Sequence, residues 1–379
     1  MTTSLTDVDP SAPDLAERRS AAERAAAMDL PRPDQEVWRY SRIGELDLER
    51  FRPAAATTEV RGADALPASD GAEVLAGAIV HDVFDELSAA HHRTVSIAVP
   101  PRTVLTEPII VTHRIAVDGV AVYPRLVVDA GEDSEFTVIE QFESAEDVTA
   151  LVVPRLLLRT GRAARVGYLA LNLLGRKVWQ IGHQQSVGER DSSTLLATVA
   201  LGGDYARVRT DARVIGQGAS TRQIALYFAD GEQMHDFRTL QDHIAPKTHS
   251  DLLFKGAVKD RAKSVYTGLI RIGEDARGAA AFQTNRNLTL SEGAWAESVP
   301  NLDIRNNDVR CSHASTVGPI DDEQRFYLES RGIEPQVAER LVVLGFFDEV
   351  LAALPVGAMR ADLRARVATK LSDGEGVGR

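Results

Sequence analysis

The sequence has a single cysteine, Cys311, among its 379 residues, which excludes an intrachain disulfide. No apolar run approaches the ~20 residues that a membrane-spanning helix needs, so we do not expect an integral membrane protein. Acidic residues outnumber basic ones, with 55 Asp and Glu against 43 Lys and Arg. The formal net charge of -12 argues against binding to nucleic acid or to anionic membranes. The first residues lack the basic start and apolar stretch of a signal peptide, and we therefore expect a cytoplasmic protein.

What the sequence does contain is a repeat of turn-like clusters. From residue 131 to residue 275 these clusters follow one another at a nearly constant interval of roughly 14 residues. They include Gly161-Arg162, Gly175-Arg176, Gly203-Asp204 and Gly231-Glu232. Between them lie alternations typical of β-strands, such as Val166–Leu171 and Ile224–Phe228. A unit of this length is too short for a helical pair or a propeller blade. We therefore predict a mainly β protein, a solenoid of stacked parallel strands with a coil of about 14 residues.

The regions on either side of the repeat have helical sequence. In the N-terminal region Trp38 and Tyr40 are predicted to be packing anchors. In the C-terminal region a surplus of apolar residues, among them Phe326 and Phe347, makes the helices a candidate docking surface. The predicted division of the chain is a disordered tail at 1–13, an N-terminal helical region at 14–90, a β-helix core at 91–318, a C-terminal helical region at 319–371 and a tail at 372–379.

Cys311 and His313 form the main candidate site. In an extended strand, side chains at i and i+2 leave the same face, so the thiol and the imidazole point into one space and can bind a metal. They cannot hold an iron–sulfur cluster alone, because such a cluster usually takes about four ligands, mostly thiolates. A structural interpretation stays open, since a free cysteine is often a small buried hydrophobe.

A second candidate is a stretch rich in histidine and aspartate. It contains His235, His243 and His249, with Asp236, Asp242 and Asp251. His235 and His249 are separated by one interval of the repeat, so a coil of that length puts them on adjacent coils, where stacked imidazoles could bind a metal. Polar residues at the turns of a solenoid more often satisfy backbone groups, and we favour that structural role.

The segment from Cys311 to Ile333, with the sequence CSHASTVGPIDDEQRFYLESRGI, resembles the signature of the SufB/SufD family of iron–sulfur cluster assembly proteins. Phe254-Lys255-Gly256 and Gln283–Leu288 are also similar to that family, and Glu36–Ser41 resembles the SufD branch more than SufB. Ala314 departs from the pattern, because the family commonly has glycine after the histidine.

The resemblance implies a right-handed parallel β-helix between helical terminal regions, and a scaffold subunit rather than an enzyme. The implied partners are a SufB-like subunit, met through the β-helix, and a SufC-like ATPase, docked on the C-terminal helices and responsible for ATP hydrolysis. Isolated chains are expected to form homodimers. The implied cofactor is a nascent iron–sulfur cluster shared with the partner, with none bound permanently. His313 matches the family position proposed to face that cluster, with Cys311 beside it.

Two other interpretations stay open at this stage. One is a cytoplasmic β-helix enzyme acting on carbohydrates, similar to pectate lyases, with Asp and Arg residues available on several coils. The start of the sequence, without signal-peptide character, counts against it. The other is a purely structural solenoid, which the importance of Cys311 and His313 for cluster formation would distinguish. No P-loop motif occurs, so we expect any ATP hydrolysis to come from a partner.

Overall fold

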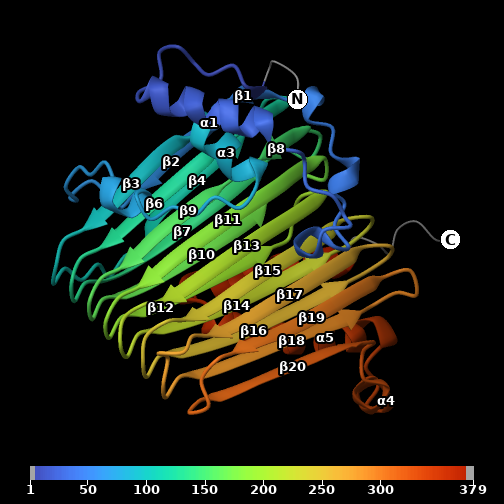
Figure 1. The fold of residues 1–379 in the computed structure, drawn as a ribbon. Helices are drawn as coiled ribbons and strands as arrows, with labels where there is room; N and C mark the ends of the chain where they lie inside the picture. Colours follow the sequence, from blue (N-terminus) through green and yellow to red (C-terminus); the bar gives the residue numbers. More distant parts are fainter. Residues whose placement is uncertain (1–4, 373–379) are drawn as a thin grey trace.

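The computed structural model, which describes residues 5–372, is a β-solenoid built from two sheets of 11 and 9 strands (Figure 1). The 11-stranded sheet contains β1 (Arg52–Ala54), β3 (Arg93–Val99), β5 (Val120–Val122), β6 (Pro124–Ala130), β8 (Ala150–Val152), β9 (Arg155–Thr160), β11 (Val178–Gly188), β13 (Tyr205–Val214), β15 (Met234–His243), β17 (Lys263–Ile272) and β19 (Trp295–Ile304). The 9-stranded sheet contains β2 (Thr57–Arg61), β4 (Ile109–Ile115), β7 (Glu135–Ser144), β10 (Arg165–Leu173), β12 (Ser193–Ala200), β14 (Ser220–Ala229), β16 (His249–Val258), β18 (Ala280–Thr289) and β20 (Arg310–Gly318). From β10 to β20 successive strands alternate between the sheets. The predicted parallel solenoid is therefore confirmed.

The coil of the solenoid is longer than the sequence interval indicates. Tyr205 pairs with Met234, and Ser220 pairs with His249, so residues stacked on neighbouring coils are 29 positions apart in this part of the chain. Each unit of the sequence repeat is one strand and one turn, and two such units complete a coil. The predicted coil of about 14 residues is therefore half of the actual coil. The sequence did not distinguish the two halves, because the turns at the ends of both sheets have similar composition.

Strands in the middle of the 9-stranded sheet are apolar on both faces. In β14, Ala225 and Tyr227 belong to the interior of the solenoid, whereas Ile224, Leu226 and Phe228 face outward and are also buried. A strand that is covered on both faces has a continuous apolar run rather than an alternation. This explains why the segment at 224–228 contains no polar residue.

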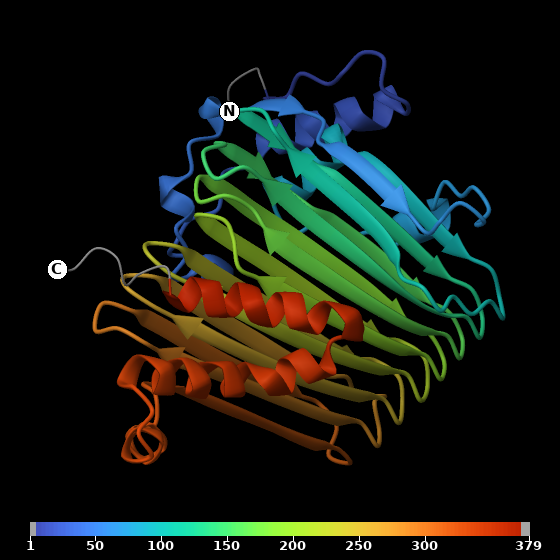
Figure 2. The same cartoon turned by 180° about the vertical axis from the view of Figure 1, so that it is seen from behind.

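The C-terminal helices cover the outer face of that sheet (Figure 2). They are α4 (Asp322–Ser330), α5 (Pro335–Ala353) and α6 (Arg360–Ser372), with a short 3-10 turn at Gly357–Met359 before α6. Val343 and Phe347 of α5 are fully buried in the same cluster as Leu226. The apolar residues of α5 and α6 therefore serve mainly as core, and the exposed aromatic side chains of this region are on α4, where Phe326 is 72% and Tyr327 is 57% exposed.

The N-terminal head packs on the outer face of the 11-stranded sheet. It contains α1 (Leu15–Ala27), the 3-10 turns η2 (Glu36–Trp38), η3 (Ile43–Glu45) and η4 (Leu48–Arg50), and helices α2 (Ala72–Leu75) and α3 (Val83–His91). Trp38 is buried against Phe84, with ring centroids 5.8 Å apart, which confirms its predicted role as an anchor. Tyr40 is 39% exposed and contacts Trp295.

The first residues described differ from the tail predicted at 1–13. Leu5 is buried in the head, and its carbonyl oxygen accepts a hydrogen bond from His91 Nε2 at 2.7 Å. Residues 1–4 and 373–379, which belong to the two predicted tails, lie outside the described residues. Among the helices of residues 5–372, none has both the length and the apolar character to cross a bilayer.

The two ends of the solenoid differ. At the N-terminal end the inward side chains Ile97 and Ile109 are buried, and Ala63 and Leu66 pack against their cluster. The edge strand β2 runs antiparallel to β4 and carries Glu59, which is paired with arginines. Charge on an edge strand discourages further strand pairing. The C-terminal end lacks such a cover in the described part of the chain.

Candidate functional site

The C-terminal end of the solenoid is open. β19 and β20 are the last strands of their sheets, so each has one edge that pairs with no other strand among residues 5–372. Apolar side chains at this end are accessible, with Leu302 41%, Ile304 43% and Val317 44% exposed. An unpaired strand edge next to exposed apolar side chains is a surface on which another chain can add strands.

Cys311 and His313 both lie on the inward face of β20. Cys311 pairs with Ala281 and His313 pairs with Gln283, and both partners are buried in the coil beneath. Cys311 packs partly against Ile270 and Ala281, and burial raises the pKa of its thiol. His313 is exposed at the open end. The predicted common face is therefore found, while the assignment of the two residues as metal ligands stays a prediction.

Part of the interior beneath this end is polar. Asn285 Nδ2 donates to Tyr227 Oη at 3.0 Å, Tyr227 Oη donates to Asn287 Oδ1 at 2.6 Å, and Asn287 Nδ2 donates to Asn285 Oδ1 at 2.7 Å. Buried polar groups are stable only when hydrogen bonded, and this closed set satisfies the condition. The last coils thus enclose these amide and hydroxyl groups beside the apolar cluster of Ile270, Ile272 and Ala281.

His235 and His249 of the second predicted site are not brought together. His235 is on β15 and His249 is on β16, so they lie in different sheets of one coil and not on adjacent coils as expected. His235 Nε2 donates to the Gly202 carbonyl at 3.2 Å, and His243 contacts the hydroxyl groups of Thr248 and Ser250. Burial lowers the pKa of His235 to about 3 and that of His243 to about 4. These contacts favour the structural interpretation.

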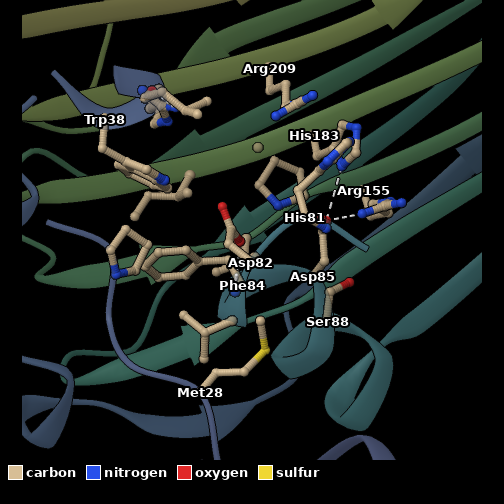
Figure 3. Close-up of a pocket in the computed structure, with 18 of the residues that line it drawn as sticks. Met28, Trp38, His81, Asp82, Phe84, Asp85, Ser88, Arg155, His183 and Arg209 are labelled. Carbon is tan, nitrogen blue, oxygen red and sulfur yellow. Dashed lines mark hydrogen bonds and ion pairs between the residues drawn. The ribbon is translucent and has the colours of Figure 1, made fainter. Parts of the chain in front are cut away.

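A pocket of about 480 Å³ lies between the head and the 11-stranded sheet. Figure 3 shows Trp38 and Phe84 on one side of this pocket and His183 and Arg155 on the other. His81, in the segment before α3, joins the polar side. The pocket is therefore formed by residues far apart in the sequence, and it exists only while the head is docked.

Charged and imidazole groups are concentrated on the polar side of this pocket. Asp211 Oδ2 lies 2.8 Å from His81 Nε2 and 3.2 Å from His183 Nε2, and Arg209 Nε donates to both oxygens of Asp211 at 3.0 Å. On the other side of its ring, His183 Nδ1 lies 3.0 Å from Asp85 Oδ1. Arg155 also pairs with Asp85.

Burial and pairing set the protonation of this cluster. Burial lowers the pKa of His183 to about 4. Burial acts to raise the pKa of Asp211, but hydrogen bonds from His183 and His81 outweigh it and hold the carboxyl well below its usual range. His183 is therefore neutral at neutral pH, while Asp211 is charged. Sequence reasoning missed this cluster, because its members come from three separate segments.

Comparison with known proteins gives consistent matches. The model of the SUF system FeS cluster assembly SufBD core domain matches residues 113–346, more than half of the chain. The chain is 29% identical to the iron-sulfur cluster assembly protein SufD of Escherichia coli over 86% of this chain and 78% of that protein. It is 28% identical to SufD of Bacillus subtilis over 76% of this chain and 67% of that protein. An iron-sulfur cluster assembly SufBD family protein of Mycobacterium tuberculosis is 42% identical, but the match spans about half of each, 50% of this chain and 49% of the relative.

Proposed function

The chain belongs to the SufB/SufD family of iron–sulfur cluster assembly proteins and resembles its SufD members over most of its length, and from this we infer that it is a scaffold subunit of a cluster assembly complex. In this complex it has no catalytic residue of its own and pairs with a SufB-like subunit. Family membership argues against the carbohydrate-active alternative. The observation that carries the proposal is the open end of the solenoid.

The free edges of β19 and β20 support pairing with a SufB-like β-helix. A partner strand added to these edges would satisfy their backbone groups and cover Leu302, Ile304 and Val317. Backbone pairing supplies affinity in such an interface, and the apolar side chains supply part of the specificity. When only one kind of chain is present, the same surface would pair with a second copy, as expected for a homodimer in isolation.

The nascent cluster, which is the cargo of the complex, would form at this contact. Cys311 and His313 offer one thiolate and one imidazole from a single face of β20. These are too few ligands for a cluster, so the SufB-like subunit would contribute the rest. Because burial raises the pKa of the Cys311 thiol, the free chain keeps it protonated near neutral pH, and metal binding would have to displace the proton.

The ATPase partner would dock at the C-terminal helices. Since α5 and α6 are packed on the sheet, the exposed aromatic residues Phe326 and Tyr327 of α4 are the best candidates for this contact. Aromatic residues are enriched at protein interfaces because they bury a large area at low entropic cost. ATP hydrolysis would come from this SufC-like subunit.

The substitution His313→Ala tests the cluster site. His313 is exposed, so its removal costs little packing, and we expect the complex to assemble with an unchanged melting temperature but with less iron and sulfide per complex. Cys311→Ser should have the same effect on iron. His249→Ala, which removes an exposed histidine from β16, is the matched control and should load normally. Normal iron loading in a stable His313→Ala complex would overturn the ligand assignment.

A further inference from the structure

We propose that His81, His183 and Asp211 form a binding site for a divalent first-row transition metal ion at the boundary between the head and the solenoid. His81 precedes α3, His183 is on β11 and Asp211 is on β13. The site is on the outer face of the 11-stranded sheet, away from the open end that carries Cys311. It goes beyond the proposed role in cluster assembly and does not depend on it.

The donor set and its spacing fit such an ion. Two imidazole nitrogens and one carboxylate oxygen suit Fe²⁺, Co²⁺ and Zn²⁺, and leave positions open for water or another ligand. Two ligands each about 2.0–2.1 Å from one ion lie roughly 2.8–3.4 Å apart. The two separations between Nε2 and Asp211 Oδ2, 2.8 Å for His81 and 3.2 Å for His183, fall in that range. All three ligand atoms lie within 4.8 Å of one another, and the rings of His81 and His183, both of which line the pocket, have their centroids 4.9 Å apart.

The two contacts of the His183 ring place one nitrogen toward the proposed ion. Nδ1 lies 3.0 Å from Asp85 and Nε2 lies 3.2 Å from Asp211. In the tautomer whose Nδ1–H donates to Asp85, the Nε2 lone pair points toward Asp211 Oδ2. An ion held by Nε2 and Oδ2 would therefore leave the contact with Asp85 intact.

The surrounding residues hold the ligands in the orientation that a metal requires. Metal-binding histidines commonly donate their other N–H to a carboxylate, and Asp85 takes that position behind His183. Asp85 is itself fixed, because it accepts from the His81 backbone N–H at 2.8 Å and pairs with Arg155. Arg209 holds the carboxylate plane of Asp211 through its Nε. The pocket beside the group gives an ion access from solvent.

Metal binding at this position would join two parts of the molecule. Asp85 and His81 belong to the head, whereas His183 and Asp211 belong to the solenoid. An ion that binds the docked state and not the unfolded chain stabilises the docked state by mass action. We therefore expect metal to raise the melting temperature of the chain as well as to bind it.

The test uses the full chain carrying Cys311→Ser and His313→Ala, so that the open end contributes no ligand. After removal of metal with EDTA, this parent is titrated with Co²⁺, followed by its visible absorption, and with Zn²⁺, followed by calorimetry. We expect one equivalent to bind and the melting temperature to rise. In the parent, His81→Gln keeps an N–H that can donate to Asp211 but removes a ligand, and it should weaken binding at least about tenfold. His249→Ala in the same parent should leave binding unchanged.

Three results would overturn the proposal. The first is the absence of saturable binding of one Co²⁺ by the parent. The second is equal affinity in the parent and in His81→Gln, because the ion would then be bound elsewhere. The third applies even if His81→Gln fails to fold: X-ray absorption of the zinc-loaded parent that shows fewer than two imidazole ligands. None of these outcomes bears on the iron loading of the complex, so the proposed function is tested separately.

Discussion

Phe347→Ala tests whether the C-terminal helices are part of the solenoid core. Phe347 is in the middle of α5, has no exposed surface and belongs to the cluster that joins α5 and α6 to β10, β12, β14 and β16. The substitution leaves a cavity between the helix and the sheet. If α5 is only a docking module for a partner, this cavity should affect the helices alone. If α5 is core, the whole protein should be destabilised.

The expected loss is large relative to the stability of a protein. Truncation of a fully buried phenylalanine costs about 3–5 kcal/mol, and total unfolding free energies are about 5–15 kcal/mol. Leu341 is on the same helix but is 42% exposed, so Leu341→Ala should cost less than about 1 kcal/mol. The ratio of the two decreases in unfolding free energy, and not either value alone, measures how completely α5 is covered.

Urea unfolding followed by two probes decides between the alternatives. The chain has three tryptophans, Trp38, Trp179 and Trp295, which lie in the head and in the 11-stranded sheet, so their fluorescence reports on parts remote from α5. Far-UV circular dichroism reports on the helices and strands together. We expect Phe347→Ala to shift both transitions to lower urea by the same amount. A loss below about 1 kcal/mol with unchanged fluorescence would refute the assignment of α5 to the core.

Two further predictions concern pH and partner docking. Burial lowers the pKa of His235 from about 6.5 to about 3, so unfolding takes up a proton and the free energy of unfolding falls as the pH drops from 6.5 toward 3. His235→Gln can still donate to the Gly202 carbonyl but does not titrate, so between pH 7.5 and 4.5 its unfolding free energy should fall by about 2–3 kcal/mol less than that of the wild type. Equal pH dependence of urea unfolding in the two proteins would contradict this. Replacing both Phe326 and Tyr327 by serine should change the melting temperature by no more than about 2 °C, because both side chains are exposed. The same replacement should abolish copurification of the proposed ATPase partner, and undiminished copurification would show that α4 is not the docking surface.

The solenoid could be predicted from the sequence because its turns have a distinct backbone conformation. Gly203, Gly218 and Gly231 adopt positive φ at the ends of strands, and Asp191 and Lys247 do so at equivalent turns. These residue types mark turns in the sequence, but they do not tell which sheet a turn leaves. The number of residues in a coil therefore could not be read from the turns, since one sheet contributes every second turn.

The two sites differ in how far the sequence could reveal them. Cys311 and His313 share a face because they are two residues apart on one strand, which is local information. His183 and Asp211 are 28 residues apart, which is close to one coil, so they were recognisable only once the coil length was known. The position of His81 depends on the docking of the head, where Trp38 and Phe84 pack together. The residue pattern around His81 in the sequence does not indicate that contact.

The unequal ends of the solenoid limit how many chains can assemble through it. The end at β2 is blunted by an antiparallel, charged edge strand, and the end at β19 and β20 is open. A filament would require two complementary ends on every subunit. Residues 5–372 offer one open end, so if the proposed partner pairs through it, the first partner to add would also end growth. The proposed pair, whether with a different chain or with a second copy, would then have no open end left for a further chain.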